Sequence, residues 1–121
     1  MPRNMSFFLT TEQIRNRTKT VTRRTGWGNL KPGEIVNACV KCQGLKPGEK
    51  VERICQIRIV SNTPEELWRI TKPGCVAEGF PDMSPDAFVA MFRKHMGGGV
   101  NQIVNVIEFE YVESAKTGGE A

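Results

Sequence analysis

The chain has 121 residues, of which 39% are hydrophobic and 25% are charged, with a formal net charge of +4. This composition is typical of an ordinary globular domain and excludes a wholly disordered, collagenous or coiled-coil chain. No apolar run approaches the roughly 20 residues that span a bilayer, and Met5–Leu9 is too short for the core of a secretion signal. We therefore expect a single domain over residues 1–121, located in the cytoplasm and without membrane contact.

The positive charge is concentrated near the N-terminus. Residues 1–24 contain six of the 17 basic side chains and one of the 13 acidic ones, a local charge of +5. The remaining residues contain 11 basic and 12 acidic side chains and sum to −1. A local basic cluster fits a phosphate-bearing partner and fits a solvated basic segment equally well.

The first elements are short. Met5–Leu9 predicts a strand, and Thr10 followed by Gln13 forms a capping-box pattern that predicts the start of a helix. The β-branched run Thr18–Thr22 favours extended chain, so the chain is expected to change direction near Arg17–Lys19.

The middle of the chain predicts a hairpin followed by a helix. Glu34–Val40 and Lys50–Ser61 are expected to be antiparallel strands joined by a loop. Thr63–Glu66 is a capping box with proline at the first helical position, which predicts a helix that continues through Ile70 and stops at Pro73.

The last third predicts one irregular segment, one helix and one strand. Cys75–Met83 is expected to be irregular, a helix is expected from Ser84 to the glycines at 97–99, and Asn101–Val112 alternates as a final strand. Residues 113–121 are a polar tail. This order predicts an α+β fold, with a small curved mixed sheet or partly closed β-barrel and short helices at its rim.

The four cysteines raise the question of a metal site. Cys39 and Cys42 have the spacing of half a zinc site, whereas Cys55 lies in an alternating strand and Cys75 has no cysteine nearby in the sequence. Without a secretion signal, stable disulfides are not expected either. We therefore expect reduced cysteines and no bound metal.

The segment Arg17–Arg24 combines three threonines, one lysine and three arginines. In an extended chain Thr20, Thr22 and Arg24 share one face. A hydroxyl beside an ammonium and a guanidinium can hold an oxygen-rich ligand and activate a nucleophile. The same composition also fits an edge strand whose charges lie in water.

Five segments together resemble a known family. They are Lys19–Arg24 after a short helix, Trp27, Leu30–Gly33 before a strand, Glu78–Phe80 before a helix, and Val106–Tyr111 in the last strand. This pattern, over roughly residues 5–112, resembles the ASCH domain, a branch of the PUA-like superfamily.

The family signature is Gly-x-Lys-x-x-Glu-x-Arg. Lys19 and Arg24 match it, while Arg17 stands at the glycine position and Thr22 at the glutamate position. Threonine also occurs there in some members, including bacterial ones similar to a small amidohydrolase that deacylates N4-acetylcytidine. Because glycine favours the left-handed end of a helix, Arg17 is expected to alter the rim of the site.

The resemblance implies both a site and a partner. The partner would be a modified nucleoside or RNA, with no cofactor or metal, while the oligomeric state stays open. The implied catalytic residues are Lys19, Thr22 and Glu78, and the implied substrate-binding residues are Arg23, Arg24, Trp27 and Phe80. Trp27 and Phe80 are equally suited to core packing.

Three functions are compatible with these residues. The first is an amidohydrolase acting on an acylated nucleoside, and the second is an RNA-binding module without catalysis. The third is a ribonuclease, in which Lys19 and Arg24 would stabilise the phosphorane and Glu78 would act as base. The limited basic area of a chain with a net charge of +4 favours the first.

Overall fold

The computed structural model describes residues 2–42 and 44–113, so most of the polar tail predicted at 113–121 lies outside the described residues. None of the helices in these ranges is long and apolar enough to cross a membrane. The elements in chain order are β1 (Arg3–Ser6), the 3-10 turn η1 (Phe8–Thr10), α1 (Thr11–Arg15), β2 (Val21–Arg24), β3 (Ile35–Cys39), β4 (Arg53–Glu66), the 3-10 turn η2 (Leu67–Arg69), α2 (Lys72–Ala77), α3 (Pro85–Met96) and β5 (Ile103–Tyr111).

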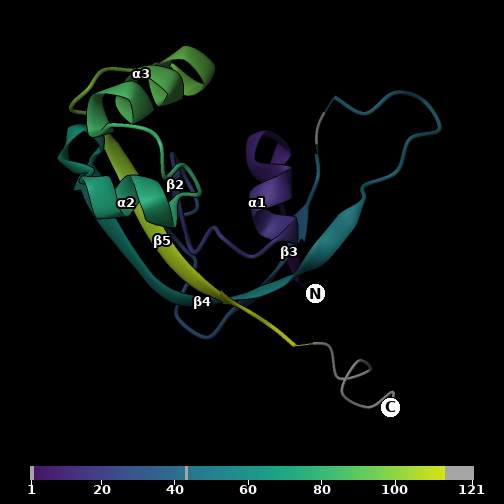
Figure 1. Cartoon of the computed structure of the whole chain (residues 1–121). Coiled ribbons are helices and arrows are strands. Elements are labelled where there is room, and N and C mark those ends of the chain that lie inside the picture. Colours follow the sequence, from purple (N-terminus) through teal and green to yellow (C-terminus); the bar gives the residue numbers. More distant parts are fainter. Residues whose placement is uncertain (1, 43, 114–121) are drawn as a thin grey trace.

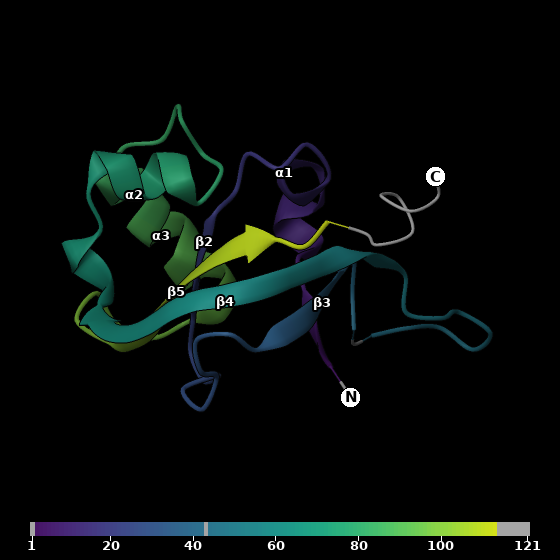
Figure 2. The ribbon, with the colours of Figure 1, turned by 90° about the horizontal axis from the view of Figure 1, so that it is seen from below.

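The strands form one five-stranded mixed sheet in the order β1-β3-β4-β5-β2. β1 pairs with β3 in parallel, and the other neighbours are antiparallel. β4 and β5 curve together, and the three α-helices lie on the concave side of that curve (Figure 1). Figure 2 shows the long β4 ribbon crossing beneath the helices. The α+β fold with a curved sheet and short helices at its rim is thus confirmed.

The N-terminal strand begins and ends earlier in the chain than the predicted strand Met5–Leu9. β1 ends at Ser6, and Phe7 turns the chain into η1, so Phe8 and Leu9 are not in a strand. The Phe7 amide donates to the Cys39 carbonyl and its ring is 1% exposed, whereas the Phe8 side chain is 62% exposed. Burial of Phe7 and pairing with β3 therefore decide where β1 ends.

The helix predicted from Thr63 is wrong, because Thr63–Glu66 continues β4. These residues pair with β5, with Pro64 opposite Asn105. β4 pairs with β3 only as far as Arg58, so Pro64 lies where β4 has a neighbour on one side alone. A proline without an amide hydrogen is tolerated at such a position.

The helix stop predicted at Pro73 is also wrong. Pro73 lies in the first turn of α2, where the Thr71 hydroxyl accepts a hydrogen bond of 3.4 Å from the Gly74 amide. The first turn is the one place in a helix that suits proline. Cys75, expected in an irregular segment, is a fully buried residue of α2.

Two later elements match the prediction. In α3 the Ser84 hydroxyl accepts from the Ala87 amide at 3.1 Å, and Gly97 follows the helix with a φ of 79°. β5 lies within the predicted strand Asn101–Val112. The antiparallel pairing expected between the two middle strands is observed between β3 and β4.

The buried apolar residues form two clusters. The first joins the β1 end of the sheet to α1 and contains Phe7, Ile14 and Ile57. The second joins η2, α2 and α3 to the other end of the sheet and contains Leu67 and Phe88. The segment that connects α1 to β2 contacts the end of α2, so it joins these two parts of the fold.

Candidate functional site

A pocket of about 190 Å³ lies between the N-terminal segment, β2, the turn after α2 and helix α3. Four residues, Thr10, Lys19, Thr22 and Glu78, are the buried polar or charged residues of the described chain. All four line this pocket. Buried polar groups cost free energy unless they are paired, so their concentration in one place marks the pocket as the candidate site.

Lys19 and Glu78 form a buried ion pair in this pocket. The Lys19 Nζ lies 2.5 Å from Glu78 Oε1 and donates a second hydrogen bond of 2.9 Å to the Glu78 backbone carbonyl. The two side chains are 3% and 4% exposed. An ammonium has three N–H donors, so one remains for a ligand.

Burial lowers the pKa of the Lys19 ammonium below its usual value, while the Glu78 carboxylate opposes that shift. The nearby Arg24 and Arg23 guanidinium groups lower this pKa further. Lys19 is therefore easier to deprotonate than a surface lysine, which is a property of groups that carry protons in catalysis.

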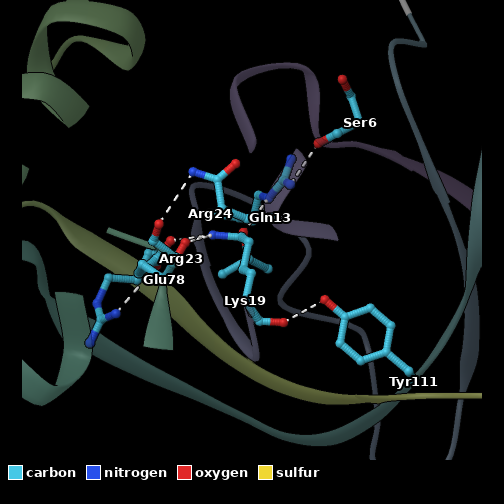
Figure 3. A network of polar contacts seen from close by, with 9 residues as sticks. Ser6, Gln13, Lys19, Arg23, Arg24, Glu78 and Tyr111 are labelled. Atoms are coloured by element: carbon cyan, nitrogen blue, oxygen red, sulfur yellow. Dashed lines mark hydrogen bonds and ion pairs between the residues drawn. The ribbon is translucent and has the colours of Figure 1, made fainter. Parts of the chain in front are cut away.

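Two arginines of β2 extend this network. The Arg23 guanidinium lies 3.3 Å from Glu78 Oε2, so the carboxylate is held between Lys19 and Arg23 (Figure 3). The Arg24 Nε donates to the Thr22 hydroxyl at 3.0 Å, and another nitrogen of Arg24 donates to the Ser6 carbonyl at 2.6 Å. Burial lowers the pKa of Arg24 to about 10, with Glu78 opposing the shift.

Backbone contacts fix the position of Lys19. The Thr20 amide donates to the Ala77 carbonyl at 2.8 Å, which holds the segment before β2 against the end of α2. The Tyr111 hydroxyl donates to the Lys19 carbonyl at 2.6 Å (Figure 3). Gln13, expected in a capping box, instead donates its side-chain amide to the Gly79 carbonyl at 3.2 Å, and the Thr10 side chain makes no cap bond.

Gly79 follows α2 with a φ of 97°, beside Lys19 and Gln13. A Cβ built there would lie 2.7 Å from the Gln13 Cγ. We expect Gly79→Ala to lower the free energy of unfolding by about 1–3 kcal/mol, because it adds a close contact to an unfavourable backbone conformation. Denaturant unfolding measures this difference.

Gly33→Ala is the matched control for this substitution. Gly33 has a φ of 93° and open space where its Cβ would be. It shares the backbone cost without the close contact, so Gly79→Ala should be the more destabilising. Equal losses would contradict a role for the Gln13 contact.

Arg17, which stands where the ASCH resemblance implies a glycine, has a φ of 62°. Its guanidinium lies 2.8 Å from a Glu113 carboxylate oxygen and 5.3 Å from the centre of the Tyr111 ring. Arg17 does not line the pocket. Arg17 contacts Tyr111, whose hydroxyl donates to the Lys19 carbonyl. It thus lies outside the pocket and is linked to Lys19 through this tyrosine.

The remaining wall of the pocket is mostly apolar. Of the two aromatic residues that the resemblance implies for substrate binding, Phe80 lines this pocket and Trp27 lines a neighbouring one. His95, an exposed residue near the end of α3, also lines the pocket, and nothing in the sequence motifs had indicated this. The other apolar residues of the wall include Phe7, Phe8, Phe88, Met91 and Phe92.

The cysteines are free in the structure. Cys39 and Cys75 are buried, while Cys42 and Cys55 are partly exposed. Burial raises the pKa of the Cys39 thiol to about 11, so this cysteine is a weak nucleophile at neutral pH. Within residues 2–42 and 44–113, no group of three or more His, Cys, Asp or Glu side chains is placed to hold a metal ion.

Comparison with known proteins supports the fold. No family model matches the sequence, and no curated protein matches it. The structure is similar to the crystal structure of protein EF3133 from Enterococcus faecalis V583, which is described under the family name DUF984. The match has a TM-score of 0.64 and 14% sequence identity, and it covers 93% of this chain and 80% of that chain. At this identity the likeness shows a shared fold.

Proposed function

We propose that this protein is an ASCH-type amidohydrolase that removes the acyl group from an N4-acylated cytidine or a related modified nucleoside. The observation that carries the proposal is the buried Lys19–Glu78 ion pair, which shares one pocket with Thr22 and Arg24. The ASCH resemblance suggests the class of reaction, and the pocket that these residues line supports them as its site.

The pocket is suited to a small, flat group. Its volume of about 190 Å³ is below the range of about 300–1,000 Å³ usual for pockets that hold a whole drug-sized molecule. Phe80 and other aromatic side chains in its wall can stack on a base. This combination supports entry of a single acylated base, with its sugar at the mouth of the pocket.

A purely structural role explains the ion pair poorly. The Lys19 and Glu78 side chains are almost fully buried, and a buried ion pair is often no more stabilising than apolar residues of similar size. Two donors of Lys19 and both oxygens of Glu78 are occupied, so the pair is fixed in orientation. A fixed charged pair beside a ligand pocket is typical of a site that transfers protons.

Four residues would share the reaction. Thr22 either attacks the acyl carbon or positions the attacking water, and the guanidinium N–H that its oxygen accepts from Arg24 lowers the cost of the alkoxide. The third N–H of Lys19 faces the oxyanion. Glu78 takes the proton of the nucleophile and gives it to the exocyclic nitrogen as the C–N bond breaks, which releases the free amine. Where water is the nucleophile, the other product is the carboxylate. Where Thr22 is the nucleophile, the other product is a Thr22 ester, and a water that gives its proton to Glu78 hydrolyses this ester to the carboxylate, the proton returning to the Thr22 oxygen.

A direct assay tests the proposal. The purified protein is incubated with N4-acetylcytidine, with N4-methylcytidine as a non-hydrolysable control, and with single-stranded RNA, and the products are separated by chromatography. We expect cytidine and acetate from the first substrate and no cleavage of the RNA. Cleaved RNA would instead support a ribonuclease, and bound but unchanged RNA would support a binding module.

A further inference from the structure

A second pocket adjoins the candidate active site. It has a volume of about 490 Å³ and shares Ser6, Phe8 and Arg24 with the first pocket. Its other walls include Trp27, before β3, and Lys41, after β3. A molecule that enters the first pocket therefore has room to extend past Arg24 into the second.

The basic residues near the N-terminus do not form an open positive surface. Arg24 is the one of the six that has no carboxylate partner among the described residues. The other five each lie 3.9 Å or less from a carboxylate oxygen: Arg3, Arg15, Arg17, Lys19 and Arg23.

Within the described residues, the positive charge of Arg24 is not balanced by a paired carboxylate, although the side chain is largely shielded from water. Burial lowers the pKa of Arg24 to about 10. Its hydrogen-bond partners, the Thr22 hydroxyl and the Ser6 carbonyl, are neutral. A guanidinium has five N–H donors, and these bonds use two of them. Buried charges are normally paired, so Arg24 is suited to an anion that the ligand brings.

Lys41 provides a second positive charge in the same pocket. Its ammonium lies 5.8 Å from the centre of the Phe8 ring, and within the described chain no carboxylate pairs with it. Phe8 borders both pockets, and Trp27 adds a half-buried aromatic side chain to the second. Two unpaired cations beside aromatic rings suit one phosphate attached to a sugar and base.

We propose that the substrate is an acylated mononucleotide, with its base in the first pocket and its phosphate between Arg24 and Lys41 in the second. This inference rests on the proposed function and names the substrate class of the same site. Two cations match one phosphate, whereas a longer RNA would need further unpaired basic residues along its path.

Substrate comparison tests the inference. The values of kcat/KM are measured for N4-acetylcytidine, its 5′-monophosphate, its 3′-monophosphate and a short acetylated oligonucleotide. We expect one monophosphate to exceed the nucleoside by about tenfold or more, since charge-assisted hydrogen bonds to phosphate exist only in the nucleotide. Equal values for nucleoside and monophosphates, or a preference for the oligonucleotide, would overturn the proposal.

Two lysine variants test whether Lys41 causes the preference for a nucleotide over the nucleoside. Lys41→Ala should reduce the ratio of nucleotide to nucleoside kcat/KM by about tenfold. Lys50→Ala removes the same charge from an exposed position of the loop between β3 and β4, away from the pocket, and should leave the ratio unchanged. A ratio that Lys41→Ala leaves intact would place the phosphate elsewhere and overturn the proposal.

A binding measurement separates this inference from the proposed function. Calorimetry compares cytidine with its 5′- and 3′-monophosphates on the wild type and on Lys41→Ala. If no acylated compound is hydrolysed, the proposed function fails, and tighter binding of a monophosphate that depends on Lys41 still supports the phosphate subsite. If hydrolysis occurs and Lys41 affects neither binding nor turnover, the subsite fails and the function stands.

Discussion

Replacement of Lys19 by methionine is expected to reduce deacylation by about 10²–10⁴-fold and to lower the free energy of unfolding by about 3–5 kcal/mol. The stability loss follows because Glu78 would remain 3% exposed while losing the ammonium 2.5 Å from its Oε1. Removal of one partner leaves a buried charge that Arg23, at 3.3 Å, compensates in part. Denaturant unfolding and a steady-state assay measure the two effects separately.

The double variant Lys19→Met/Glu78→Gln distinguishes catalysis from folding. It removes both charges of the pair and leaves an amide oxygen that can accept from Arg23, but the Arg23 guanidinium, 8% exposed, then loses its carboxylate partner, so we expect only part of the lost stability to return. Activity should not return, because the variant has no ammonium and no carboxylate for proton transfer. A double variant that is both stable and active would show that the ion pair is structural.

The sequence was sufficient to predict the fold class and to single out the polar segment Arg17–Arg24. Ser84 and the glycine at 97 marked α3 correctly, because both ends of that helix are set by local hydrogen bonds and backbone conformation. The alternating pattern of β5 was equally reliable. These signals depend on neighbours within a few residues, which a single sequence contains.

Local signals failed where distant residues decide the structure. Thr63–Glu66 has the pattern of a helix start, but its pairing with β5 residues about 40 positions away outweighs that preference. Gln13 has the pattern of a capping residue, but its amide reaches the Gly79 carbonyl, 66 residues along the chain. In both places a tertiary hydrogen bond replaced the local one.

The same limit applies to the site. Lys19, Thr22 and Arg24 lie in one short segment, so their proximity was predictable from the sequence. Glu78 was assigned only through the ASCH resemblance, and the structure places its carboxylate 2.5 Å from Lys19 Nζ. No sequence signal joined the Tyr111 hydroxyl to the Lys19 carbonyl across 92 residues. The unpaired charge of Arg24 became visible only after the partners of the other basic residues were known.

Replacement of Thr22 by alanine is expected to lower kcat by about a hundredfold or more and to change KM little. Thr22 is 3% exposed, lines the pocket and accepts a hydrogen bond from Arg24. Removal of a nucleophile, or of the group that positions one, acts on the transition state more than on substrate binding. Arg24→Ala should raise KM, because Arg24 contributes to recognition of the bound substrate, and should lower kcat less than Thr22→Ala does, because the hydroxyl remains and loses only its hydrogen bond from Arg24.

Thr20→Ala and Thr22→Ser are the controls for this prediction. Thr20 is an exposed threonine two positions earlier that lies outside the pocket, so its replacement should leave kcat unchanged. Thr22→Ser keeps the hydroxyl and should retain most of the activity, whereas a structural requirement for the threonine methyl group would make serine as poor as alanine. Wild-type deacylation by Thr22→Ala would remove Thr22 from the mechanism and leave Lys19 and Glu78 to activate a water unaided.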